Sequence, residues 1–176
     1  MTISITGIQE TRKVLEGIIN PTPIIPDQRL SNILGAKSFL KAECLQRGGS
    51  FKVRGAYNKI SKLSDEEKSR GVCTASAGNH AQGVALAAKL QGVKATIVLP
   101  EFAPLTKVVA TKALGADVIL EGDSFDAAVA YSRELERERG YTYVHAFDDP
   151  LIVAGQGSVG CEIAEDLPNV TVIVVP

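Results

Sequence analysis

The second half of the chain repeats one pattern of apolar strand, loop, helix and glycine, and this repetition limits the possible folds. From Gly71 onward, short apolar runs alternate with helical segments of about ten residues or more. Segments of that length join parallel strands by right-handed crossovers rather than by hairpin turns. The predicted strands are 72–75, 95–99, 118–120, 143–144 and 170–175, separated by helices at 78–90, 104–114, 124–139 and 150–166. The chain is therefore predicted to be an α/β protein with a parallel sheet.

The first seventy residues do not follow this pattern. Thr6 and Gln9 have the spacing of a capping box and predict the start of a helix, which Asn20-Pro21 would end. Three prolines predict an extended segment at 21–26, and alternating polar and apolar residues predict a strand at 37–42. A loop is expected at 46–49. Helices are expected at 51–63 and 64–71.

Charge and hydropathy exclude several classes of partner. The 176 residues carry 19 basic and 20 acidic side chains, a net charge of −1, and no basic stripe that would attract nucleic acid. The longest apolar runs are far shorter than the about 20 residues of a membrane-spanning helix. The start of the chain lacks the charged region and apolar core of a secretory signal, which predicts a cytoplasmic protein.

Cysteine and histidine are too sparse to predict a metal site. Cys44, Cys73 and Cys161 are odd in number and widely spaced, so neither a disulfide framework nor a zinc motif is indicated. We expect three free thiols that are buried or half-buried. His80 and His145 lie far apart and lack ligand partners at zinc spacing, so no metal is expected.

A lysine at the mouth of a predicted helix is the first candidate for chemistry. Lys52 follows Phe51 directly in the stretch Ser50–Gly55. The fixed charge of Arg54 is expected to lower the pKa of Lys52, and a partly neutral lysine can form a Schiff base with a carbonyl group. Phe51 either offers a ring face at this site or packs in the core, and both interpretations stay open.

The second candidate is the turn Ser76-Ala77-Gly78-Asn79-His80, between a strand and a helix. Small residues at such a turn leave backbone N–H groups free to bind a carboxylate or phosphate. Asn79 can hydrogen-bond a phenolate-like oxygen. In the alternative interpretation this is an ordinary strand-to-helix turn, in which Ser76 or Asn79 caps the helix.

The stretch Gly155–Gly160 matches the Gly-x-Gly-x-x-Gly pattern of dinucleotide-binding proteins. That pattern should follow a buried strand directly, whereas residues 150–154 have helical character. We therefore interpret the glycines as positions in a helix that allow close packing or the close approach of a ligand.

These stretches together resemble the threonine dehydratase (threonine ammonia-lyase) and serine racemase group. This group belongs to the tryptophan synthase β-like fold of pyridoxal phosphate enzymes. The resemblance runs through nearly the whole chain and rests on Pro21-Thr22-Pro23, Lys41-Ala42-Glu43, 49–56, 76–83 and 148–157.

The resemblance implies a role for each candidate residue. It implies that Lys52 carries pyridoxal 5′-phosphate as a Schiff base and that Phe51 packs on the pyridine ring. It further implies that Asn79 bonds the 3′-oxygen of the cofactor. The turn from Ser76 to His80 would receive the substrate carboxylate.

The resemblance also implies a division of the chain. Residues 47–150 would form a small mobile α/β domain, and residues 1–46 and 151–176 would be portions of a larger cofactor domain. In this family the phosphate loop follows a strand like the one predicted at 170–175. We therefore expect a fold that is incomplete at the C-terminus and a chain that is part of a longer one, in a homodimer or homotetramer.

The implied reaction is the deamination of a small hydroxy amino acid. L-Threonine would give 2-oxobutanoate and ammonia, as in isoleucine biosynthesis, and L-serine would give pyruvate as a secondary activity. Racemases of the group have a serine at the position of Ala77, so the sequence favours elimination over racemisation. The alternatives are a serine racemase or serine dehydratase, and a non-catalytic α/β domain that binds a nucleotide or another anion.

Overall fold

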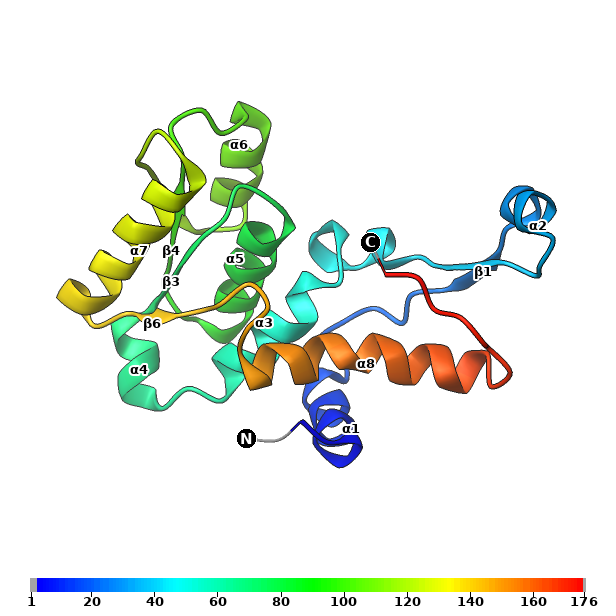
Figure 1. The fold of residues 1–176 in the computed structure, drawn as a ribbon. Helices are drawn as coiled ribbons and strands as arrows, with labels where there is room; N and C mark the ends of the chain where they lie inside the picture. The colour runs from blue at the N-terminus through cyan, green and yellow to red at the C-terminus, as the bar shows by residue number, and fades with distance from the viewer. Residues whose placement is uncertain (1–2, 176) are drawn as a thin grey trace.

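The computed structural model describes residues 3–175 and contains a four-stranded parallel sheet in the order β5-β4-β3-β6 (Figure 1). Met1, Thr2 and Pro176, which fall in the predicted flanking ranges, lie outside these residues. Each adjacent pair of strands is parallel, which confirms the prediction of an α/β fold with crossover connections. The strands are β3 (Val72–Ala75), β4 (Ala95–Leu99), β5 (Asp117–Leu120) and β6 (Thr142–Tyr143).

Helices cover both faces of this sheet (Figure 1). On one face, α5 (Asn79–Gln91) and α6 (Leu105–Ala113) pack over Ile97 and Leu99 of β4. On the other face, α7 (Phe125–Arg139) packs over Val98 through Ala128 and Leu135. Successive residues of β4 thus enter opposite cores, as the alternation of side chains along a strand requires.

Several helices begin and end at residues that are typical start and stop signals. The Ser124 hydroxyl accepts a hydrogen bond from the N–H of Ala127 and begins α7. Ser64 and Glu67 form a capping box at the start of α4 (Asp65–Arg70). Gly92 and Gly140 end α5 and α7 in the left-handed conformation, with φ of 67° and 65°, which glycine adopts without strain.

The N-terminal part differs from the prediction at both ends of its first helix. Helix α1 (Ile5–Leu15) is capped by Ser4, whose hydroxyl accepts from the N–H of Gly7, so Thr6 is not the cap. The helix ends at Leu15, and Gly17 turns the chain with a φ of 72° before the prolines are reached. A glycine in the left-handed conformation is therefore the stop signal here, in place of Asn20-Pro21.

A hairpin extends from this part, away from the parallel sheet (Figure 1). Strands β1 (Ile24–Pro26) and β2 (Phe39–Lys41) pair in antiparallel fashion, and α2 (Gln28–Leu34) lies between them. Helix α2 was not predicted, although Leu30, Ile33 and Leu34 have the spacing of one helix face. These side chains are exposed, and the helix buries none of its residues. Two 3₁₀ turns, η1 (Glu43–Leu45) and η2 (Arg47–Gly49), then lead to α3.

Helix α3 (Lys52–Ser61) lies between α5 and α8 (Pro150–Asp166), as Figure 1 shows. The Gly-x-Gly-x-x-Gly stretch is part of α8. A methyl group at Gly155 would lie 2.4 Å from the Cα atom of Gly55. The prediction that these glycines permit close packing is therefore confirmed for Gly155.

Residues 170–175 do not form the predicted strand. They lie outside every strand of the part of the chain that the structure describes, and the Val174 side chain is 86% exposed. A parallel strand forms only where its backbone groups pair with a neighbouring strand, and apolar residues do not replace that pairing. Within residues 3–175, none of the helices has the length and apolar character needed to cross a bilayer.

The three cysteines are free, but they differ in exposure. Cys73 of β3 is buried and Cys161 of α8 is half-buried, as predicted. Cys44 is exposed, so the prediction is wrong there. It lies in the 3₁₀ turn η1, which buries none of its side chains.

Candidate active site

Lys52 is the first residue of α3, and its side chain is half-buried. The Nζ atom donates a hydrogen bond of 2.8 Å to the carbonyl oxygen of Ala146. It also lies 5.3 Å from the centre of the Phe51 ring, a distance at which an ammonium group and an aromatic ring attract each other. The amine is therefore held at a defined place between α3 and the segment that precedes α8.

Burial lowers the pKa of Lys52 below the ordinary value of 10.5. The cause is desolvation, which disfavours the ammonium form. The expected contribution of Arg54 is wrong, because its guanidinium is fully buried against the carboxylates of Glu43 and Glu162, which balance its charge. The amine at Lys52 is thus a better nucleophile than an exposed lysine amine at the same pH.

The turn after β3 starts α5 without a side-chain cap. Gly78 occupies the N-cap position, so neither Ser76 nor Asn79 caps the helix as the alternative interpretation required. The Ser76 hydroxyl accepts a hydrogen bond of 3.2 Å from the N–H of Gly78, and Asn79 is exposed. An uncapped helix start presents backbone N–H groups and a positive dipole end, which suits a carboxylate or phosphate.

His80 lies in the first turn of α5 and is 4% exposed. Its Nε2 atom lies 3.0 Å from the carbonyl oxygen of Val144. Since a carbonyl group only accepts, Nε2 carries the proton and Nδ1 is bare, and Nδ1 has no partner among the described residues. Desolvation lowers the pKa of His80 to about 4, with a further contribution from the charge of Lys52. His80 is therefore neutral at pH 7.

The structure brings the two predicted stretches together. Lys52 and His80 bond the carbonyl groups of Ala146 and Val144, two residues apart on one segment. Helices α3 and α5 also touch directly, because a methyl group at Gly83 would lie 2.9 Å from the carbonyl carbon of Lys52. The amine and the uncapped helix start thus lie close together in the fold.

Sequence reasoning missed the segment that carries these carbonyl groups. His145 stabilises it, since its Nδ1 atom accepts from the N–H of Phe147 at 3.2 Å and of Asp148 at 2.8 Å. The groups at Val144 and Ala146 that contact the candidate residues are backbone carbonyls, which every residue has. No pattern of side chains could have identified them.

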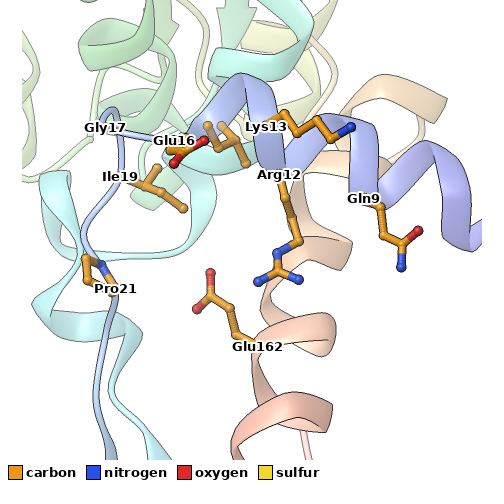
Figure 2. A pocket seen from close by; sticks show the side chains of 9 residues that line it. Gln9, Arg12, Lys13, Glu16, Gly17, Ile19, Pro21 and Glu162 are labelled. Carbon is orange, nitrogen blue, oxygen red and sulfur yellow. The ribbon is translucent and has the colours of Figure 1, made fainter.

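A cavity of about 570 Å³ lies elsewhere, between α1, the turn that follows it and α8. Figure 2 shows Arg12 of α1 and Glu162 of α8 pointing toward each other across it. None of the predicted site residues lines this cavity. Residues 3–175 also contain no group of three or more histidine, cysteine or acidic side chains that could hold a metal ion.

Comparison with protein families shows to which family the chain belongs. The sequence profile of the family described as "Pyridoxal-phosphate dependent enzyme" matches residues 15–176. The chain belongs to this family. The amine of Lys52 fits the cofactor of the family, because desolvation lowers its pKa and the neutral form of an amine is the one that reacts with an aldehyde.

Two sequence relatives and one solved structure show which members of the family the chain is similar to. The chain is 51% identical to the L-threonine ammonia-lyase of Thermotoga maritima over 174 residues, which are 99% of the chain and 43% of that protein. It is 50% identical to the catabolic L-threonine dehydratase TdcB of Staphylococcus aureus strain N315, over 99% of the chain and 51% of that protein. The structure of maize serine racemase matches with a TM-score of 0.91 and 37% identity, over 96% of the chain and 51% of the racemase.

The chain thus spans about half the length of the relatives that it matches. The structural match to the racemase confirms the predicted tryptophan synthase β-like fold class and the expectation of a partial fold.

Proposed function

We propose that the full-length protein is a threonine ammonia-lyase that converts L-threonine to 2-oxobutanoate and ammonia, with L-serine to pyruvate as a secondary activity. The observation that carries this proposal is the half-buried Lys52 amine beside the uncapped start of α5. The names of the two relatives with about 50% identity support threonine as the substrate.

The candidate residues divide the binding and the chemistry among them. Lys52 binds pyridoxal phosphate covalently through Nζ, with Phe51 and Asn79 against the cofactor. The turn from Ser76 to His80 binds and orients the substrate carboxylate through the N–H groups of Ala77, Asn79 and His80. The N–H groups of Ser76 and Gly78 already donate to the Val98 carbonyl and the Ser76 hydroxyl. When bound, the cofactor withdraws the electrons left by loss of the α-proton.

Once the substrate amine has taken its place on the cofactor, the freed Nζ atom of Lys52 would accept that α-proton as the general base, which its lowered pKa favours. The β-hydroxyl then leaves as water. Hydrolysis of the released enamine takes up one water and gives the 2-oxo acid and ammonia, so the overall reaction balances without a further reagent.

Serine racemisation is the second candidate, because the fold closely matches maize serine racemase. Racemisation needs a proton donor on the face of the substrate opposite Lys52. The resemblance places Ala77 there, and a methyl group carries no transferable proton. D-Serine formed by the full-length protein as fast as 2-oxobutanoate would contradict the assignment to elimination.

The remaining expectations stay predictions. They are the division into residues 47–150 and two flanks, the homodimer or homotetramer, the cytoplasmic location and the place in isoleucine biosynthesis. The name of the Staphylococcus aureus relative describes that protein as catabolic, which favours threonine breakdown as the alternative to isoleucine biosynthesis.

Reduction with borohydride tests the proposal in the full-length protein. After incubation with pyridoxal phosphate, we expect one adduct, mapped to Lys52, and production of 2-oxobutanoate from L-threonine. Lys52→Ala should abolish both, while Lys62→Ala at the exposed C-terminal cap of α3 should change neither. A folded protein without the adduct would instead support a non-catalytic anion-binding domain.

A further inference from the structure

Arg54 is the largest side chain that is fully buried in the described structure, and every one of its five N–H donors has an acceptor. Its Nε atom bonds Glu43 at 3.0 Å, and Nη2 bonds Glu43 at 2.8 Å and Glu162 at 3.0 Å. Its Nη1 atom bonds Glu162 at 2.5 Å and the Ser158 hydroxyl at 3.0 Å. Both carboxylates thus hold the guanidinium in two-pronged geometry, which defines its orientation.

The two carboxylates are themselves held by other parts of the chain. Glu43 accepts a hydrogen bond of 2.5 Å from the Thr22 hydroxyl, and Glu162 pairs with the Nζ atom of Lys41 at 2.7 Å. Glu43 precedes α3 in the sequence, and Glu162 lies on α8, more than a hundred residues after Arg54. The guanidinium therefore ties the first turn of α3 to two segments that do not belong to it.

That first turn has a backbone bond of its own, from the N–H of Arg54 to the carbonyl oxygen of Phe51 at 3.0 Å, but no side-chain cap. Phe51 is the N-cap of α3, and a phenylalanine side chain cannot accept a hydrogen bond. The bond from the N–H of Lys52 to the Ser50 hydroxyl is long, at 3.4 Å. The Oε1 atom of Gln156 on α8 accepts from the N–H of Gly55 at 3.2 Å, so support comes from another helix.

We propose that Arg54, Glu43 and Glu162 form a positioning assembly that holds the Lys52 amine where it reacts with the cofactor. Lys52 and Arg54 lie two residues apart in this turn, so a rotation that broke the bonds of Arg54 would also move Nζ away from Ala146. A displacement of about 1 Å is enough to slow a covalent step strongly. The proposal rests on the proposed function of Lys52.

The test separates binding of the cofactor from its covalent capture in the full-length protein. The rate of adduct formation on Lys52 is measured at increasing pyridoxal phosphate, which gives a maximal rate and a half-saturating concentration. The variants are Glu43→Gln, Glu162→Gln and Arg54→Lys. Glu165→Gln is the matched control, because Glu165 lies on the same helix and pairs with Arg12 in an exposed ion pair.

We expect Glu43→Gln and Glu162→Gln to lower the maximal rate about tenfold or more, with the half-saturating concentration within about twofold of wild type. Arg54→Lys should behave alike, since an ammonium cannot bind both carboxylates in two-pronged fashion. Glu165→Gln should react at the wild-type rate. Circular dichroism and thermal unfolding identify variants that fail to fold.

Ser158→Ala keeps the test decisive if the charged variants do not fold, because it removes a single hydrogen bond to Arg54 and no charge. It should slow capture by a smaller factor without changing half-saturation. Folded variants that capture the cofactor at the wild-type maximal rate would overturn the positioning role. If the wild-type protein forms no adduct on Lys52, the proposed function fails instead, and the two failures are distinct.

Discussion

Gly155 of α8 lies directly against Gly55 of α3, so that a methyl group at Gly155 would come within 2.4 Å of the Cα atom of Gly55. This contact brings the two helix backbones close together. It lets Gln156, Ser158 and Glu162 of α8 reach the first turns of α3 with their side chains. Gly55 and Gly155 therefore allow the short distance between α3 and α8 that the hydrogen bonds between these two helices require.

Gly155→Ala should destabilise the full-length protein by about 1–3 kcal/mol, because the added methyl group overlaps backbone atoms that cannot move aside cheaply. Gly160→Ala on the same helix is the control. No atom lies within 4 Å of its methyl position, and alanine favours the helix by roughly 0.5–1 kcal/mol. Denaturant unfolding measures both. Equal effects of the two substitutions would show that the helix contact is not tight.

Gly83→Ala should slow the capture of pyridoxal phosphate by Lys52 about tenfold. The added methyl group would lie 2.9 Å from the carbonyl carbon of Lys52 and 3.0 Å from its Cβ atom, and it would push the lysine backbone away from α5. The rate of adduct formation measures the effect, and Gly160→Ala again serves as the control. A wild-type rate in a folded Gly83→Ala protein would contradict the contact between α5 and Lys52.

His80 should make stability depend on pH between 6.5 and about 4. Burial lowers its pKa from 6.5 to about 4, so within this window the unfolded chain binds a proton that the folded chain does not. The free energy of unfolding should therefore fall by about 3 kcal/mol as the pH falls through the window, with the full value present above pH 6.5.

Denaturant unfolding at several pH values measures this loss of stability. In His80→Asn the slope between pH 6.5 and 4 should become shallower, because asparagine does not titrate. Carboxylates such as Asp149 affect stability at lower pH. Burial alone would raise the pKa of Asp149, but Lys59 and backbone N–H groups lower it below its ordinary value of 3.8. The same slope in both proteins would show that His80 is not the group responsible.

Cys73 should resist alkylation in the native protein, whereas Cys44 should react. Desolvation, with a smaller effect of Glu136, raises the pKa of Cys73 to about 12, and its thiol lies 3.5 Å from the carbonyl oxygen of Ser132. Cys44 is exposed. Since the thiolate is the reactive form, iodoacetamide at pH 8 should label Cys44 much faster.

Peptide mass spectrometry before and after denaturation measures this difference in labelling. Denaturant should make the two thiols equally reactive. Native labelling of Cys73 at the rate of Cys44 would contradict the buried position of β3.

The sequence by itself determined the elements whose signals are local. Ser124 and Gly140 mark the two ends of α7 at the predicted residues, and the strand at 95–99 has the predicted bounds. Caps, glycine turns and apolar spacing act within a few residues of one another, so their effect does not depend on the rest of the fold. The two stretches around Lys52 and Gly78 were identifiable for the same reason.

Only the tertiary structure decided how distant residues act on one another. Lys52 bonds the carbonyl of Ala146, 94 residues away, and Arg54 is balanced by two carboxylates instead of acting on Lys52. The apolar run 170–175 has the composition of a strand, but within residues 3–175 it pairs with no other strand. Burial, charge pairing and strand pairing each require a partner from elsewhere in the chain, and no local pattern specifies which partner the fold will supply.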